Sequence, residues 1–220
     1  MSLLNNDPLA FALSFIYVIV IVLTAKYLKE KGISSNTLRE LTHTSMGVWP
    51  VLWFLFNDNL WATSVPLLVT IMLAFAPKSI RRTFSEGDEK HIGLVFYAFS
   101  FTVVTYFFFM RYEGAAAIFS LAFGDGLGGL IGSRYGKHRY KIPWVKEKSI
   151  EGSLTVFLLS MLSITISQII FTGHLISVAI IVLGGIFVTL IEAISPYHSD
   201  NLTIPILLSV FLWLMESIVI

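Results

Sequence analysis

Long apolar stretches recur along almost the whole chain, and short polar segments separate them. A helix needs about 20 mostly apolar residues to cross a bilayer. Eight stretches approach this length, at residues 8–28, 41–56, 60–76, 91–110, 114–133, 152–171, 174–194 and 202–220. The pattern therefore predicts an all-α, polytopic integral membrane protein with about eight, or seven, transmembrane segments and no soluble domain.

The second and third stretches are short, and only Asn57, Asp58 and Asn59 separate them. These residue types favour tight turns. Two interpretations are open: two thin spans, or one hairpin that dips into the membrane and leaves it again. In both, the chain returns to the side from which it came.

Composition supports a membrane protein. The chain has 220 residues, of which 55% are hydrophobic and 13% charged, and its mean hydropathy is +0.79. These values exclude an ordinary soluble domain. Cysteine is absent, which excludes disulfides and thiolate metal sites. Lysines follow the first apolar stretch instead of preceding it, whereas a cleavable signal peptide has the reverse order, so we expect a retained helix.

Basic residues gather on one side of the predicted topology. When the loops are placed alternately on two faces, one face receives only Arg111 and the other receives fourteen of the fifteen Lys and Arg residues. Short loops rich in basic residues are retained in the cytoplasm. We therefore expect the fourteen to mark the cytoplasmic side and both termini to lie outside.

An acidic residue, Asp125, lies well inside the fifth stretch. A carboxylate in hydrocarbon is costly, so its side chain is expected to face protein, a metal or a watery cavity. Ser133, at the cytoplasmic end of the stretch, is eight residues away, which corresponds to about 12 Å of helical rise. Asp125 is thus within reach of cytosolic solutes.

Glycines recur at every fourth position of the same stretch, at Gly124, Gly128, Gly132 and Gly136. On a helix they form a bare stripe. Such a stripe permits close packing of a second helix, and it also permits a nucleotide to approach the backbone. The acid beside the stripe favours the second use, because packing alone does not need Asp125.

The loop after this stretch carries candidate phosphate-binding groups. Ser149 is a plausible N-cap for the sixth stretch. The free N–H groups and the positive end of that helix would face the cytosol, where Lys148 adds a full charge. Asp125 and Glu151 are the first candidates for contact with Mg²⁺ or for accepting a proton. The alternative for Glu151 is a first-turn acid that complements the helix dipole.

Two further groups of polar residues lie on the same predicted face. Glu192 and Asp200 are candidate metal ligands or orienting carboxylates. Asn201 and Thr203 are candidates for substrate contact or for capping the last helix. We keep both interpretations open for this second pair.

Arg39 and His43 are four residues apart and therefore share one face of a helix. Together they suggest phosphate binding or deprotonation of a substrate hydroxyl. Arg81 and Arg82 are topology signals in one interpretation and nucleotide contacts in the other.

Taken together, these residues resemble the CTP-dependent lipid-alcohol kinases, which comprise phytol and farnesol kinases, dolichol kinase and CTP-dependent diacylglycerol kinase. The nucleotide motif of that group reads D-x2-A-x3-G-x3-G, a basic spacer, then K-K/S/T-x-E-G. The motif residues of this chain are Asp125, Gly132, Gly136, Lys148, Ser149, Glu151 and Gly152, with Lys137 in the spacer. Gly128 stands where the motif usually has Ala.

The resemblance is greatest to the phytol kinase branch. The segment from Arg39 to His43 is similar to its R-K-x-x-H segment, with Glu40 in place of the usual Lys. Glu192 and the run Asp200-Asn201-Leu202-Thr203-Ile204-Pro205 are similar to its E-x-x and D-N-L-T-x-P segments.

The resemblance implies one transmembrane kinase domain over residues 1–220, with the nucleotide-binding motif in residues 123–153. It implies transfer of the γ-phosphate of CTP to the hydroxyl of a membrane-embedded prenol, with Mg²⁺ or a similar cation. CTP and the prenol are expected from the resemblance alone. The implied partners are the lipid alcohol, CTP and membrane lipids, and no nucleic acid.

Two rival functions would use some of the same residues. A CTP:phosphatidate cytidylyltransferase has a similar motif but attacks the α-phosphate, and the small size and the D-N-L-T-x-P segment favour the kinase. A transporter could use Asp125 and Glu192 as an ion pathway. A pathway needs polar groups on both sides of the midplane, whereas nearly all of these lie near one face.

Overall fold

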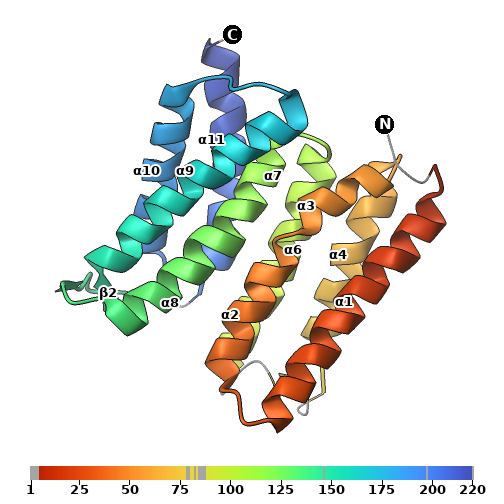
Figure 1. Ribbon diagram of the computed structural model, residues 1–220, viewed down its shortest axis with the longest axis horizontal. Helices are drawn as coiled ribbons and strands as arrows, with labels where there is room; N and C mark the ends of the chain where they lie inside the picture. Colours follow the sequence, from red (N-terminus) through yellow and green to blue (C-terminus); the bar gives the residue numbers. More distant parts are fainter. Residues whose placement is uncertain are drawn as a thin grey trace.

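The computed structural model describes residues 5–77, 80–81, 83, 88–145, 147–196 and 198–219, and these are almost entirely helical (Figure 1). The long helices are α1 (Asp7–Glu30), α4 (Asn59–Ala74), α6 (Asp88–Phe108), α9 (Ile150–Thr172), α10 (Val178–Ile194) and α11 (Asp200–Val219). Shorter pieces are α2 (Ser35–Met46), α3 (Trp49–Leu52), the 3₁₀ turn η1 (Trp53–Leu55), α7 (Tyr112–Phe119), the π-helical segment η2 (Ser120–Asp125) and α8 (Gly126–Tyr135). The all-α prediction is confirmed.

Five helical segments are long and apolar enough to cross a membrane: Asp7–Glu30, His91–Phe108, Tyr112–Tyr135, Ile150–Thr172 and Asp200–Ile218. Two shorter apolar helices, α4 and α10, accompany them. These seven helices account for every predicted stretch except 41–56, which consists of the end of α2, α3 and the turn η1. The described residues form no separate soluble domain. The number of membrane crossings stays a prediction.

On α9, small polar side chains are buried and large apolar side chains are exposed, which is the opposite of a helix in a water-soluble protein. The buried face of α9 contains Ser160, Ser163 and Ser167, while large apolar side chains such as Leu158 and Leu162 are exposed. Small polar residues between helices and apolar residues outside are typical of helices that pack within lipid. The arrangement agrees with the predicted membrane location.

The second and third stretches each run along the length of the neighbouring helix α1, and whether they cross the membrane stays a prediction. Lys29, at the end of α1, donates a hydrogen bond to Ser35 at the start of α2, with 2.6 Å between Nζ and Oγ. At the other end of α1, Asp7 Oδ1 accepts from the backbone N–H of Asn57, at 2.6 Å. The α2–α3–η1 segment therefore runs along the whole length of α1, and α4 then runs back.

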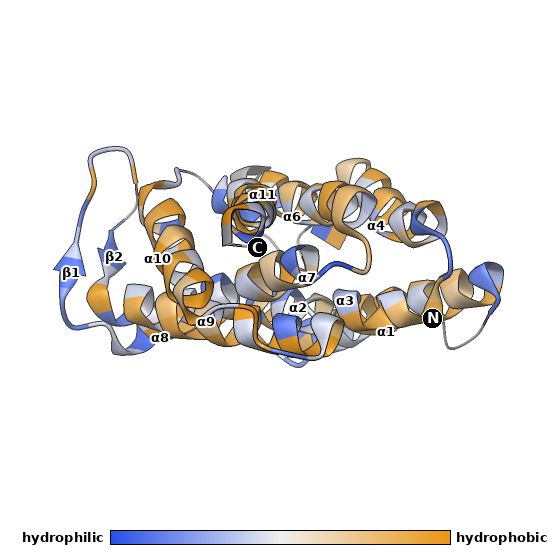
Figure 2. Ribbon diagram, turned by 90° about the horizontal axis from the view of Figure 1, so that it is seen from above, coloured by the Kyte–Doolittle hydropathy of each residue, from blue (hydrophilic) through white to orange (hydrophobic). Residues whose placement is uncertain are grey.

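The helices lie in two layers with α10 at one side (Figure 2). One layer contains α4, α6 and α11, and the other contains α1, α2–α3, α7–α8 and α9. Contacts of α1 with α4 and of α7 with α6 and α11 join the layers. A continuous apolar core lies between them, with Trp53, Ile118, Ile164 and Leu208 among its fully buried members.

The described chain begins and ends at the same end of the bundle (Figure 1). The opposite end holds the turn between α1 and α2, the end of α8 and a two-strand hairpin in which β1 (Arg139–Tyr140) pairs with β2 (Lys148–Ser149). Most of the described basic residues belong to these connections. Which end faces the cytoplasm stays a prediction.

Candidate active site

A polar cavity of about 230 Å³ opens at the basic end of the bundle. Its walls come from α2, α8, β2, the start of α9, the end of α10 and the start of α11. The cavity collects most of the residues that the sequence singles out: Arg39, His43, Asp125, Gly128, Gly132, Lys148, Ser149, Gly152, Glu192, Asp200 and Asn201. Segments that are far apart in the sequence therefore meet at one site.

Asp125 lines this cavity, in agreement with the expectation that its carboxylate avoids lipid. It is the last residue of the π-helical segment η2, whose wider turn interrupts the helix just before the acid. Such segments occur often at functional sites. Asp200, Glu192 and Lys148 are close enough to Asp125 to interact with it electrostatically.

Lys148 and Glu192 form an ion pair in the cavity wall. The Lys148 Nζ atom lies 2.5 Å from Glu192 Oε1, and it also donates to the backbone carbonyl of Glu192. Both side chains are largely buried. Desolvation lowers the pKa of Lys148, but the Glu192 carboxylate more than offsets this, so the net shift is upward. The amine therefore keeps its positive charge at neutral pH.

Three buried polar atoms at the cavity have no hydrogen-bond partner among the described residues. They are Arg39 Nε, His43 Nε2 and Glu192 Oε2. Buried polar atoms are almost always paired, because an unpaired one is costly. The three atoms include donors and an acceptor, so the cavity suits a polar, charged ligand that would complete their hydrogen bonding.

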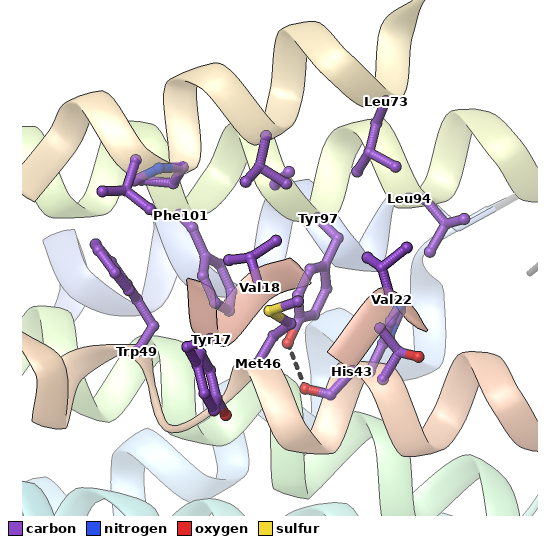
Figure 3. Close-up of a pocket in the computed structure, with 15 residues that line it drawn as sticks. Tyr17, Val18, Val22, His43, Met46, Trp49, Leu73, Leu94, Tyr97 and Phe101 are labelled. Carbon is purple, nitrogen blue, oxygen red and sulfur yellow. Dashed lines mark hydrogen bonds between the residues drawn. The ribbon is translucent and has the colours of Figure 1, made fainter. Parts of the chain in front are cut away.

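His43 is held firmly in place by its neighbours. Its ring stacks on that of Tyr97, with 4.1 Å between centroids, and the Tyr97 hydroxyl donates to the His43 carbonyl at 2.7 Å (Figure 3). One turn earlier in α2, Arg39 pairs with Glu40 at 2.9 Å. Both members of this pair line the cavity, so the charge of Arg39 is partly offset there.

The N-terminus of α9 opens onto the cavity through Ser149 and Gly152. Ser149 Oγ accepts from the Gly152 N–H at 3.1 Å, which confirms the predicted N-cap. Lys148 immediately precedes this cap in β2. A positive side chain and the positive end of a helix dipole therefore face the same space.

The glycine stripe packs against α9. A Cβ atom at Gly132 would lie 2.8 Å from Ser149 Oγ, and one at Gly128 would lie 2.5 Å from a Val156 methyl group. The stripe thus permits the close helix packing that was one of its two interpretations. Gly128 and Gly132 also reach the cavity wall, and their contact with a nucleotide stays a prediction.

Other predicted residues lie apart from the cavity. The Glu151 carboxylate hydrogen-bonds His138 Nδ1 at 2.8 Å and does not line the cavity. Gly136 and the exposed Lys137 also lie outside its wall. Thr203 donates to the Ser199 carbonyl at 3.0 Å, as expected for a residue in the first turn of a helix.

Arg82 lies outside the described residues, so its predicted nucleotide contact has no structural counterpart here. Asn201 has a clear structural role in addition to lining the cavity. Its side-chain amide donates to the Gly93 carbonyl at 2.9 Å and so joins α11 to α6.

Comparison with known proteins identifies two relatives. A phytol kinase from Synechocystis sp. is 28% identical over 198 residues, which cover 84% of this chain and 83% of that protein. The chloroplastic farnesol kinase of Arabidopsis thaliana is 28% identical over 141 residues, which cover 57% of this chain and 45% of the relative. This chain is related to the phytol and farnesol kinases. The resemblance to this branch that the motifs predicted is thereby confirmed.

No protein-family model matches the chain, and no solved structure matches it. The alignment with the phytol kinase extends over most of both proteins. The similarity therefore covers most of the bundle and is not confined to the nucleotide motif.

Several cavity residues had not been identified as functional from the sequence. Arg139, Glu147 and His198 line the cavity, and so does Glu40, which in the sequence is only a departure from the R-K-x-x-H segment. Arg139 and Glu147 belong to the loop that the sequence marked as basic. The charged loop between the two halves of the nucleotide motif indicates that some of its side chains could reach the site. The sequence does not show which of these side chains line the cavity.

A metal site formed by the protein alone is not present among the described residues, where no three His, Asp or Glu side chains are grouped to hold an ion. Mg²⁺ commonly binds through one or two carboxylates together with substrate phosphates and water. Asp125, Glu192 and Asp200 line one cavity, and Glu192 Oε2 has no hydrogen-bond partner among the described residues. The donor set fits an ion that arrives with a nucleotide.

Proposed function

We propose that the chain is a kinase that transfers the γ-phosphate of CTP to the hydroxyl of an isoprenoid alcohol embedded in the membrane. One observation supports this most strongly. Most residues of the nucleotide motif line a polar cavity at one end of an apolar bundle, and this cavity contains buried polar atoms without a partner in the described chain. Its relatives are a phytol kinase and a farnesol kinase.

The phosphates of the nucleotide are expected to lie between Lys148, the N-terminus of α9 and Arg39. Phosphate groups are stabilised by helix N-termini and by charged donors. Lys148 would supply a positive charge, and the backbone N–H groups at the start of α9 that Ser149 leaves uncapped would supply hydrogen-bond donors. Arg39 approaches from α2, on the opposite wall.

Asp125, Asp200 and Glu192 are the residues that would hold a divalent cation. Bound Mg²⁺ would neutralise negative charge on the phosphates during transfer. The three carboxylates lie close enough to act on one another electrostatically, so an added positive charge relieves their mutual repulsion. Lys148 already offsets part of this charge through its pair with Glu192.

In the proposed reaction the acceptor oxygen attacks the γ-phosphorus. The bond from that phosphorus to the oxygen bridging it to the β-phosphate breaks, and CDP leaves with the bond electrons. The hydroxyl proton passes to a base on the protein. His43 Nε2 is the candidate, because it is buried at the cavity and has no hydrogen-bond partner among the described residues.

The test uses the purified chain in lipid nanodiscs, Mg²⁺, and CTP that carries radioactive phosphorus at the γ position. The acceptor panel contains farnesol, geranylgeraniol, phytol, dolichol and diacylglycerol, and the other nucleoside triphosphates serve as competitors. Label in the lipid with release of CDP supports the proposal. A CDP-lipid with release of pyrophosphate would replace the kinase by a cytidylyltransferase.

A further inference from the structure

A second cavity, of about 90 Å³, lies beside the polar one and has a different character. It is partly open, and its lining residues come from α1, α2, α3, α4 and α6 (Figure 3). Apolar side chains form most of its wall, among them Val18, Met46, Val65, Leu73, Leu94 and Phe101. Trp49 stands at one end and Leu73 and Leu94 at the other.

His43 belongs to both cavities. It is the one residue that lines the apolar cavity and the polar cavity alike among the described residues. Its side chain is 4% exposed, and its Nε2 atom has no hydrogen-bond partner within the described chain. The junction of the two cavities is therefore marked by one orphaned, buried polar atom.

The other polar groups in the apolar wall already have partners. Tyr17 and Tyr97 donate to the backbone carbonyls of Ser45 and His43, at 2.5 Å and 2.7 Å. Trp49 donates to Thr105 at 2.9 Å, and Thr42 is likewise bonded to the backbone. A ligand in this cavity therefore finds hydrocarbon contacts everywhere except at His43, which is the pattern of a site for a molecule with one polar end.

We propose that this cavity binds the hydrocarbon of the acceptor next to its hydroxyl, with the hydroxyl hydrogen-bonded to His43 Nε2 and directed into the polar cavity. The assignment rests on the proposed function. It names a binding site on α1, α2, α4 and α6, outside the nucleotide motif. The ligand class is a single-chain alcohol.

The size of the cavity limits how much of the chain it holds. An apolar cavity of about 150 Å³ binds benzene, so one of about 90 Å³ encloses only the carbons nearest the hydroxyl. The remainder of the chain continues into the bilayer beside α1 and α4. Selectivity therefore depends on the structure near the hydroxyl, such as a methyl branch, more than on total chain length.

Neighbouring residues on α1 and α4 provide matched variants. Val18 and Leu73 line the cavity, whereas the adjacent Ile19 and Met72 face outward and are 44% and 58% exposed. Val18→Phe and Leu73→Phe fill the cavity, while Ile19→Phe and Met72→Phe add similar bulk toward lipid. Each pair thus separates loss of the cavity from a general disturbance of the helix.

Kinetics on the full chain in nanodiscs test the proposal. Val18→Phe and Leu73→Phe are expected to raise the KM for farnesol by about tenfold with an unchanged KM for the nucleotide, and the outward controls to change neither. In the unmodified chain, farnesol and geranylgeraniol are expected to react alike, and straight-chain hexadecanol more weakly. Equal acceptor KM values in Val18→Phe and Ile19→Phe would overturn the site and leave the kinase assignment intact.

A binding measurement separates this proposal from the proposed function. A farnesol analogue with a diazirine near the hydroxyl is photo-crosslinked to the chain without nucleotide, and the labelled peptides are identified. Labelling on α2 and α6 that excess farnesol suppresses, and that Val18→Phe reduces, supports the site even if no alcohol is phosphorylated. Labelling confined to outward-facing residues would overturn it.

Discussion

Two buried glutamates at opposite ends of the bundle differ in how their oxygens are satisfied. Glu113, at the start of α7, accepts hydrogen bonds from Arg111 at both carboxylate oxygens. Arg111 also forms an ion pair with Glu216. Glu192, at the end of α10, uses only Oε1 for Lys148, and its Oε2 has no partner in the described chain. The end of the bundle with Glu113 is called the closed end, because both carboxylate oxygens have partners. The end with Glu192 is called the open end, because one oxygen at the cavity has no partner in the described chain.

This difference shows which buried charge has capacity for a ligand. Both oxygens of the Glu113 carboxylate already accept hydrogen bonds from Arg111, so this carboxylate has little remaining capacity for a ligand. A pair with a free oxygen beside Asp125 and Asp200 retains an acceptor that a bound cation or donor can use. The predictions below test whether the two ends differ in function as the hydrogen bonding indicates.

The largest effect is expected at the open end, for Asp125→Asn. The change keeps the shape of the side chain and removes the charge that faces the cavity, so phosphate transfer should fall by about a thousandfold or more, as expected when a metal-binding or charge-stabilising group is lost. Initial rates with saturating farnesol and CTP measure it. Membrane insertion and thermal stability are checked in parallel, and activity near that of the unmodified chain would remove Asp125 from the mechanism.

Lys148→Met is expected to reduce kcat/KM about 100-fold and to destabilise the fold by about 3–5 kcal/mol, because Glu192 is left as an unpaired buried charge. The double variant Lys148→Met, Glu192→Gln removes that charge. It should recover much of the thermal stability in a melting experiment while remaining inactive. Recovery of activity together with stability would show that Lys148 acts only through packing.

A smaller effect is expected for Gly132→Ala, in the stripe that packs on α9. The added methyl group overlaps Ser149, the cap of α9, and overpacking of this kind costs about 1–3 kcal/mol. Gly129→Ala is the control, since nothing lies near the position of its added Cβ. Thermal melting in detergent should separate the two, and equal melting temperatures would contradict the packing.

The smallest effect on activity is expected at the closed end. Glu113→Gln removes the charge that Arg111 satisfies, so the free energy of unfolding should fall by about 1–3 kcal/mol. Its kcat/KM below the melting temperature should match that of the unmodified chain. A large loss of kcat/KM without unfolding would show that the two ends are functionally connected.

The sequence predicts much of the architecture because lipid imposes simple rules. The lengths of the apolar stretches predict the helical segments, and the uneven distribution of basic residues predicts one basic end. The structure has both features. The path of residues 41–76 along the bundle could not be predicted in this way. It depends on the contacts of Ser35 and Asn57 with the two ends of α1, which no local pattern specifies.

The polar cavity was largely predictable and the apolar one was not. A charged residue in an apolar stretch is conspicuous, so Asp125 and Glu192 attract attention in the sequence. Val18 and Ile19 are chemically alike, yet one lines a cavity and the other faces outward. In lipid both environments favour the same residue types, so apolar composition cannot distinguish them. The orientation of Glu151 toward His138 likewise depends on the β-hairpin geometry, which the motif does not contain.

The wide turn that ends at Asp125 has a consequence for how tolerant this region is to changes in length. Upstream, the alanines of α7 are buried where it contacts α9, and downstream the glycines of α8 pack on the same helix. A regular helix through Ser120–Asp125 would place the two faces out of phase by the rotation of one residue, about 100°. Deleting a single residue there would allow a regular α-helix that keeps both contacts with α9, so the expected loss is the wide turn next to Asp125 and not the helix packing.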